Sequence, residues 1–160
     1  MKNKIAVSFV FASFTFVTAQ VWAGVEIGNG KYVNFKSEQL RLELDHPIEW
    51  QPYEAPEAVT LGELDVDPMT ASNFKIMRKP MTAGVSLEQL RSLLEAIEPQ
   101  MIWEDVMIAG RMGFKSSDPF VGKIYLLNDR NEVVSMTYRA RNQKQCLEDL
   151  NFMLQSLKLF

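Results

Sequence analysis

The sequence is poor in the two side chains that most often build catalytic and transition-metal sites, because it has one histidine, His46, and one cysteine, Cys146. A single cysteine excludes an intramolecular disulfide, and no Cys/His ligands stand at the spacing of a zinc site. Cys146 falls on the apolar side of a predicted helix, where a cysteine is ordinarily a small buried residue. We therefore expect an unreactive thiol and no bound cofactor or metal.

His46 is the only imidazole that could act as a general base. Asp45 precedes it directly, and in a strand these two side chains point to opposite faces, which is a poor geometry for orienting the ring. Glu43 and Glu49 would complete at best a partial zinc ligand set. We expect His46 to lie on the surface at a strand end and the protein not to be an enzyme. A hydrolase that uses His46 with nearby acids is the alternative.

Positive charge is also scarce: 17 Lys and Arg residues stand against 20 Asp and Glu residues, a formal net charge of −3. A mildly acidic protein is a poor ligand for nucleic acids and anionic membrane surfaces, which attract basic proteins. We expect the partner to be a protein or an envelope component and not a nucleic acid. The sequence implies no particular oligomeric state.

The longest apolar run, residues 5–17, is short for the roughly 20 residues that cross a bilayer. Lys2 and Lys4 precede it, and Val21-Trp22-Ala23 follows with residues that signal peptidase accepts. We interpret residues 1–23 as a secretory signal peptide cleaved after Ala23, or alternatively after Ala19. A retained anchor or a buried N-terminal strand is the other interpretation.

Residues 24–160 are then expected to form one domain that is periplasmic or secreted and not inserted in a membrane after cleavage. No cysteine stands near the cleavage point to carry a lipid. Loss of two lysines leaves 15 basic against 20 acidic residues, a net charge of about −5.

The last forty residues carry the strongest structural pattern. Residues 121–127 and 132–139 alternate in polarity on either side of Asn128-Asp129-Arg130-Asn131, which predicts a β-hairpin. Asn142 and Gln145 then form a helix-start pattern. The apolar stripe of this helix needs a cover, and the preceding hairpin is the nearest apolar surface; the stripe comprises Cys146, Leu147, Leu150, Met153, Leu154 and Leu157.

Earlier segments predict three strands and a long loop. Residues 31–35 and 40–45 alternate in polarity, the second ending at His46-Pro47, and Trp50 is expected to close one end of the core. Residues 51–70 contain three prolines and five acids without sustained periodicity, so we expect a surface loop, with a short strand around 59–64 as an option. Residues 74–79 form a further strand, ended by Pro80.

A second helix is predicted to begin after Ser86 and to end before Pro99, with its apolar stripe through Leu87, Leu90, Leu93, Leu94 and Ile97. Trp103 and residues 106–114 predict one more strand, in which Gly110 and Gly113 indicate a bulge or a close backbone approach. The fold class is therefore α+β, an antiparallel sheet of about five to seven strands flanked by two main helices that cover its faces.

This pattern resembles the fold family of the photosystem II extrinsic protein PsbP, shared by a Ran-binding nuclear import factor and by bacterial exported proteins of the DcrB type. Residues 42–50 (LELDHPIEW) match the family's strand running into a proline and a tryptophan; residues 86–97, 108–110 and 155–160 match its middle helix, its glycine-containing strand and its C-terminal finish. The resemblance implies an α/β/α sandwich and a function in binding or stabilising partners. It transfers no site residues.

The acids of residues 51–70 are our candidate binding residues, and they are Glu54, Glu57, Glu63, Asp65 and Asp67. Asp65-Val66-Asp67 places two carboxylates together, but the glycine and terminal glutamate of a twelve-residue calcium loop are missing, so a solvated acidic loop is favoured. An inhibitor or immunity protein against a toxin delivered to the periplasm would use such a face.

The remaining methionines and aromatic residues favour packing. Eight methionines follow Met1 without the clustered spacing of a copper site. A ligand groove is the alternative for a set of aromatic residues that we otherwise assign to the core and its edges: Tyr32, Trp50, Tyr53, Trp103, Phe114 and Phe120. The alternative function is a small-molecule or lipid carrier with an apolar pocket between sheet and helix.

Overall fold

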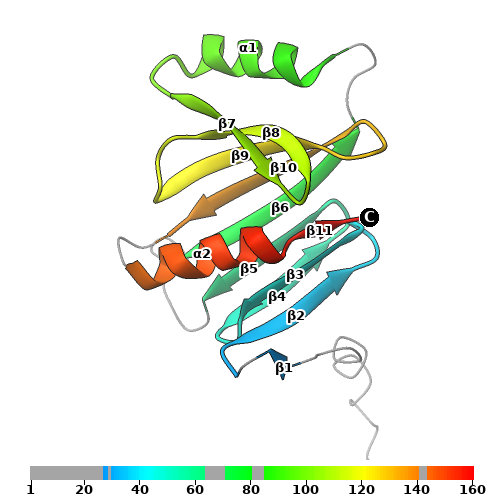
Figure 1. The fold of residues 1–160 in the computed structure, drawn as a ribbon, viewed down its shortest axis with the longest axis vertical. Helices are drawn as coiled ribbons and strands as arrows, with labels where there is room; N and C mark the ends of the chain where they lie inside the picture. Colours follow the sequence, from blue (N-terminus) through cyan, green and yellow to red (C-terminus); the bar gives the residue numbers. More distant parts are fainter. Residues whose placement is uncertain (1–26, 29, 64–70, 81–84, 141–143) are drawn as a thin grey trace, which may run out of the picture.

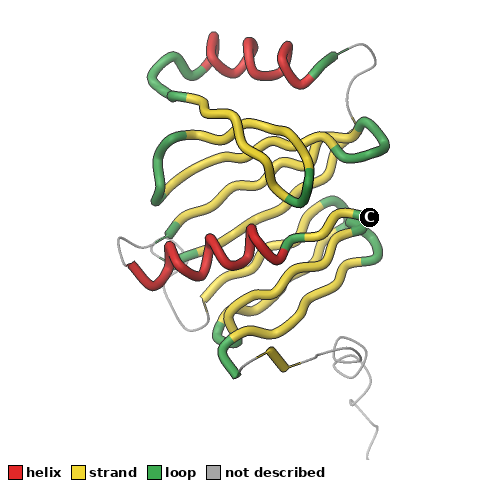
Figure 2. Tube along the Cα trace, in the orientation of Figure 1, coloured by secondary structure: helices red, strands yellow, loops and turns green. Residues whose placement is uncertain are grey.

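The computed structural model describes residues 27–28, 30–63, 71–80, 85–140 and 144–160. Within them, two antiparallel sheets and two helices form an α+β fold (Figures 1 and 2). The predicted signal peptide, residues 1–23, and the predicted binding residues Asp65 and Asp67 lie outside the described residues. Neither described helix is long and apolar enough to cross a membrane.

The larger sheet has the strand order β4-β5-β6-β10-β9-β8-β7. Its strands are β4 (Trp50–Ala55), β5 (Ala58–Glu63), β6 (Asn73–Pro80), β7 (Trp103–Ile108), β8 (Arg111–Ser116), β9 (Val121–Leu127) and β10 (Glu132–Arg139). The predicted hairpin is β9–β10, and its register pairs Ile124 with Met136 and Leu126 with Val134 on one buried face. The alternation of polarity therefore sets which face of this sheet forms the core.

The smaller sheet has the strand order β1-β2-β3-β11. Its strands are β1 (Ile27–Gly28), β2 (Tyr32–Ser37), β3 (Leu42–Pro47) and β11 (Lys158–Leu159). Phe35 pairs with Leu44, and both side chains are buried. The alternating leucines of β3 therefore turn one side of this sheet toward the core.

Residues 51–63 form a hairpin, so the prediction of a long loop from residue 51 is wrong for this part. β4 and β5 pair along their whole length, with Pro52 opposite Leu61 and the turn at Pro56 and Glu57. Proline is tolerated here because β4 is the edge strand of the larger sheet and one side of it needs no ladder hydrogen bonds.

Residues 103–116 form two strands and not one. The turn between β7 and β8 consists of Ala109 and Gly110, both with positive φ (52° and 70°), as in a two-residue hairpin turn. The predicted close approach is confirmed at Gly113, where an added Cβ would overlap the carbonyl oxygen of Tyr125. A glycine is needed there for close packing of β8 on β9.

The two helices are α1 (Leu87–Ile97) and α2 (Lys144–Ser156). α1 begins with the predicted capping box, in which Ser86 Oγ accepts from the Gln89 backbone N–H and Gln89 Oε1 accepts from the Ser86 backbone N–H. α2 lies closest to β3, which adds to the expected cover, and its apolar side shares one core with Ile124 and Met136 of the preceding hairpin. Its Met153 and Leu150 join the core between the two sheets.

α1 lies on the other face of the larger sheet, above β7 and β8 in Figure 1. The register turns Phe114 and Tyr125 to this face, and the Arg91 guanidinium of α1 stands 6.0 Å from the centre of the Phe114 ring. With α2 and the smaller sheet covering the opposite face, the layers are those of the predicted α/β/α sandwich. The predicted fold class is confirmed.

Candidate functional site

His46 is buried with 3% of its surface exposed, so the prediction of a surface histidine is wrong. It continues the inward alternation of Leu42 and Leu44 in β3, and its Nδ1 donates to the Pro47 carbonyl oxygen at 2.9 Å. Burial lowers the pKa of His46, because the charged ring would lose its hydration. In the described part of the chain no hydroxyl, thiol or carboxylate is bonded to the ring, and Asp45 instead accepts from Asn34 Nδ2 at 2.9 Å.

Cys146 is buried on α2, as predicted. Its sulfur accepts from Ser72 Oγ at 3.2 Å and lies 3.9 Å from Glu63 Oε1. The thiol is therefore buried and makes polar contacts that join α2 to Ser72 and to the end of β5. No group of three His, Cys, Asp or Glu side chains that could hold a metal occurs among the residues described.

The three described candidate acids do not form a cluster but are spread along the β4–β5 hairpin. Glu54 accepts a hydrogen bond from Ser37 Oγ, and Glu57 is exposed in the β4–β5 turn. Glu63 accepts from the Ser72 backbone N–H at 2.9 Å, at the other end of the hairpin. Four residues separate the positions of Glu54 and Glu63 along the ladder, about 13 Å at 3.3 Å per residue. Their role in binding stays a prediction.

A groove of about 740 Å³ opens beyond the C-terminal end of α1. It lies between the α1–β7 and β8–β9 connections, and its lining residues are Glu98, Gln100, Met101, Ile102, Ser117, Asp118, Pro119 and Phe120. Of the predicted aromatic set, Phe120 alone lines this groove. Tyr32, Trp50, Trp103 and Phe114 are buried, as the packing interpretation expects.

Hydrogen bonds hold the two walls of this groove in place. The Ser117 backbone N–H donates to the Ile102 carbonyl oxygen at 2.9 Å and joins one wall to the other. The Tyr138 hydroxyl donates to the Asp118 carbonyl oxygen at 2.6 Å. Asp118 Oδ1 in turn accepts from the backbone N–H groups of Phe120 and Val121, at 2.8 and 3.1 Å. The groove is therefore formed before any ligand arrives.

The groove carries negative charge. The two backbone hydrogen bonds to Asp118 lower the pKa of its carboxyl group, so it is ionised at neutral pH. Glu98 Oε1 pairs with Lys123 Nζ, whereas Glu98 Oε2 is buried and has no hydrogen-bond partner in the described part of the chain. A buried acceptor without a partner is costly, and because the protein itself covers Glu98 Oε2, this carboxylate oxygen is not offered to a ligand in the groove.

Large apolar side chains are exposed around the same end of α1. Leu93, Ile97, Ile102 and Val121 are 56%, 72%, 67% and 53% exposed. The predicted apolar stripe of α1 is only partly covered: Leu87, Leu90 and Leu94 are half-buried, whereas Leu93 and Ile97 are exposed. The helix is fixed largely by Arg91, which donates to Asp105 Oδ1 at 2.6 Å and to the Trp103 carbonyl oxygen at 2.9 Å.

Neither the groove nor the exposed stripe was predicted as a site. The groove combines residues 98–102 with residues 117–120, which come together only when the β7–β8 hairpin forms. The apolar residues of α1 have the helical spacing of a buried stripe, so the spacing alone could not show that Leu93 and Ile97 are exposed.

No protein-family model and no curated protein sequence matches the chain. Among solved structures it is similar to cyanobacterial PsbP (CyanoP) from Synechocystis sp. PCC 6803, with a TM-score of 0.59 and 10% identity over 84% of this chain and 96% of that one. A structure from Bacteroides thetaiotaomicron VPI-5482 gives a TM-score of 0.49 and 12% identity over 79% of this chain and 48% of that one. The likeness to cyanobacterial PsbP is one of fold, and the chain has the PsbP-like fold.

Proposed function

We propose that this is a non-catalytic exported protein that binds a protein partner of the cell envelope. The partner would bind the α1-end surface, by which we mean Leu93, Ile97, Ile102 and Val121 together with the groove beside them. The observation that carries the proposal is this exposed apolar surface next to a preformed groove. Exposed apolar groups with a polar rim are typical of protein interaction sites.

The geometry favours a protein over a small ligand. Ile102 lines the groove and is itself largely exposed, so an occupant would stay open to solvent on one side. A protein surface that also covers Ile97 would remove this exposed area from water. Burial of one isoleucine side chain contributes about 1.5–3 kcal/mol to such an association.

The charge of the surface favours a basic partner. Glu98 and Asp118 are the charged residues among the described lining residues, and because Lys123 pairs with Glu98, the unpaired negative charge is that of Asp118. Complementary charge raises the rate of association and disfavours acidic partners. An accessory protein, or an inhibitor or immunity protein acting on a basic target, would meet these requirements. The exported location follows from the predicted signal peptide, residues 1–23.

The carrier hypothesis is the alternative. It requires an apolar cavity between α2 and the larger sheet, where Phe74, Met136 and Met153 are completely buried and pack in the core. Native mass spectrometry of the freshly purified protein tests it, because a carrier retains a bound ligand. A ligand that leaves only on denaturation would favour the carrier over the binding protein.

The partner hypothesis is tested with a double variant, Ile97→Glu with Ile102→Glu. Crosslinking with the full-length protein in envelope extracts of the source organism identifies the candidate partner, and the purified pair is then measured by calorimetry. We expect at least about a 100-fold loss of affinity, because two apolar contacts are replaced by charges and each tenfold step needs only 1.4 kcal/mol.

The matched control is Tyr53→Glu, which changes an equally exposed side chain on the edge strand β4. This variant should bind as the unaltered protein does. A partner that binds both variants equally well, or a failure to recover any specific partner, would refute the proposed surface.

A further inference from the structure

A second pocket, of about 220 Å³, lies at the opposite ends of strands β8 and β9 from the groove. Two turns and two strands form it: the β2–β3 turn, the β9–β10 turn, the start of β8 and the C-terminal strand β11. Its lining residues are Arg41, Arg111, Asn128, Asp129, Arg130, Leu159 and Phe160. Three guanidinium groups therefore meet around a small space.

The pocket has an excess of positive charge in an acidic protein. Its lining holds three arginines and one acid, whereas the whole chain has a formal net charge of −3. The acid, Asp129, is already bound by both terminal nitrogens of Arg111. Among the described lining residues, no side-chain carboxylate pairs with Arg41 or Arg130.

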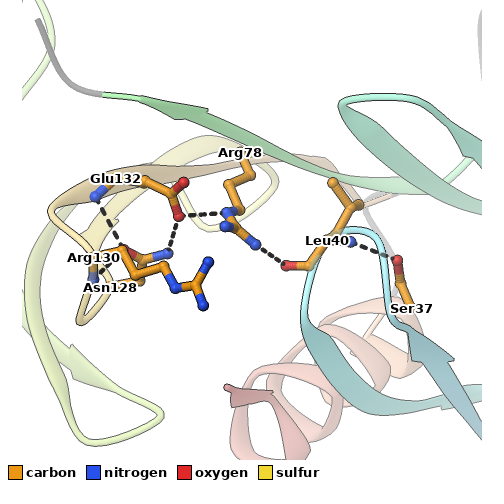
Figure 3. A network of polar contacts seen from close by, with 6 residues as sticks. All are labelled: Ser37, Leu40, Arg78, Asn128, Arg130 and Glu132. Atoms are coloured by element: carbon orange, nitrogen blue, oxygen red, sulfur yellow. Dashed lines mark hydrogen bonds and ion pairs between the residues drawn. The ribbon is translucent and has the colours of Figure 1, made fainter.

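The guanidinium groups of Arg41 and Arg130 have no hydrogen bond or ion pair with another described residue. Figure 3 shows the Arg130 side chain extending away from its turn, with no dashed line to its guanidinium group. The nearest carboxylate on that side, Glu132, is engaged instead by Arg78 Nε at 2.6 Å and Asn128 Nδ2 at 2.7 Å. Arg130 contributes, after Arg78 and Asn128, to lowering the pKa of Glu132, but the hydrogen-bond donors of both guanidinium groups stay available for an anion.

The turns that carry these two arginines are held rigidly. Asn128 Oδ1 accepts from the backbone N–H groups of Arg130 and Glu132, at 3.0 Å each. Arg78 Nη1 donates to the Leu40 carbonyl oxygen at 3.3 Å and so connects the β9–β10 turn, through Glu132, with the β2–β3 turn. Figure 3 shows this network as one continuous chain of contacts between the two sheets. A site built this way needs little ordering when a ligand binds.

Arg41 itself adopts a φ of 54°, a left-handed conformation that is unfavourable for residues other than glycine. Its carbonyl oxygen accepts from the Phe160 backbone N–H at 3.0 Å, so the turn is tied to the C-terminal strand. Glycine would fit this backbone at lower cost.

We propose that Arg41 and Arg130 bind a ligand that carries a phosphate monoester group, with its organic part on Leu159 and Phe160. Guanidinium groups bind phosphate through paired hydrogen bonds. A phosphate monoester carries roughly −1.5 to −2 charges at pH 7 and can accept from two guanidinium groups at once, whereas a carboxylate carries only one charge. The small volume fits a phosphate with a short organic group.

The test is a calorimetric titration of the full-length protein with three probes: phenyl phosphate, inorganic phosphate, and vesicles that contain phosphatidic acid. The variants Arg41→Gln and Arg130→Gln should each weaken binding at least about tenfold, and the double variant should abolish it. Arg130→Lys keeps the charge but loses the paired geometry, so it should weaken phenyl phosphate binding as well. Circular dichroism checks that each variant is folded.

The charge-matched control is Lys144→Gln on α2, whose side chain is exposed and stands outside the pocket lining. Binding of soluble phosphates that is lost in the two arginine variants but kept in the control identifies a soluble ligand. Binding to the vesicles but not to the soluble phosphates, lost in the arginine variants and kept in the lysine control, identifies a lipid headgroup as the source of the phosphate. No binding to any probe, or equal loss in the lysine control, overturns the proposed site.

Discussion

The hydroxyl of Tyr32 on β2 donates to Asp149 Oδ1 on α2 at 2.8 Å, across 117 positions of sequence. Asp149 is buried and also accepts from Gln145 Nε2 at 3.0 Å, while Lys31 Nζ stands 3.1 Å from the same carboxylate oxygen. This carboxylate therefore fastens the C-terminal helix to the first long strand. The stacking of Phe152 on Tyr32, with ring centres 3.9 Å apart, strengthens the same contact.

The first prediction is that Asp149→Ala lowers the free energy of unfolding by about 1–3 kcal/mol, because it leaves the buried Tyr32 hydroxyl without its acceptor. Urea denaturation followed by circular dichroism measures the change. Lys144→Ala, on the exposed side of the same helix, is the control and should change stability by less than about 0.5 kcal/mol. A loss for Asp149→Ala no larger than that of the control would contradict the role of this carboxylate.

The second prediction concerns Gly113, where β8 packs closely on β9. A Cβ at this position would overlap the backbone carbonyl of Tyr125 and a methyl group of Leu126, so Gly113→Ala forces the two strands apart. We expect a loss of about 2 kcal/mol or more, within the range for overpacked cores.

Gly62→Ala provides the control for this experiment, since its added Cβ would meet its nearest neighbours at 3.6 and 3.8 Å, an ordinary contact distance. Thermal unfolding of both variants makes the comparison direct. Equal melting temperatures for Gly113→Ala and Gly62→Ala would show that the close approach at Gly113 does not affect the stability of the protein.

The sequence predicted best where one local rule applied without competition. In the β9–β10 hairpin, Ile124 and Leu126 alternate with more polar neighbours and an Asn/Asp-rich turn follows, so strand, face and register could all be predicted. The start of α1 was equally predictable, because Ser86 and Gln89 satisfy each other's backbone groups. The PsbP-like fold was predicted from such elements in combination.

The sequence predicted poorly where a strand contained residues that favour turns. Pro52 and Pro56 concealed the β4–β5 hairpin, although an edge strand accepts proline. Ala109 occupies a positive-φ position that usually carries asparagine or glycine, so Gly110 alone signalled the β7–β8 turn and was interpreted as a bulge or close approach. His46, in contrast, continued the alternation of Leu42 and Leu44, and its burial could have been predicted from that pattern.

Both candidate sites depend on segments that meet only in the folded chain. The arginines at positions 41, 111 and 130 come from three different turns or strand ends, and nothing in their local sequence indicates that they share a pocket. The groove beside α1 likewise depends on the hydrogen bond between Ser117 and Ile102. Sites of this kind require the strand pairing before they can be recognised.

The third prediction is a pH dependence of stability caused by His46. Burial places its pKa in the folded protein below the ordinary value of 6.5, so the unfolded chain binds the proton more readily as the pH falls. The stability contributed by the neutral ring is fully present above pH 6.5 and decreases between that value and the lower pKa of the folded state. Unfolding free energies measured by urea titration at several pH values should show this decrease.

His46→Gln removes the titrating group, and the decrease just below pH 6.5 should become smaller in this variant. Nuclear magnetic resonance titration of the His46 ring gives its pKa in the folded protein directly. A value at or above 6.5, or the same pH dependence in both proteins, would contradict the desolvation of this side chain.

The fourth prediction separates the two helices by their contribution to stability. Ile97 of α1 is mostly exposed, so Ile97→Ala should change the free energy of unfolding by less than about 0.5 kcal/mol. Met153 of α2 is completely buried in the core, and Met153→Ala should cost about 2–5 kcal/mol. Chemical denaturation of the two variants supplies both values. A large loss for Ile97→Ala would mean that the apolar side of α1 is already covered within the protein, and the proposed partner surface would then not exist.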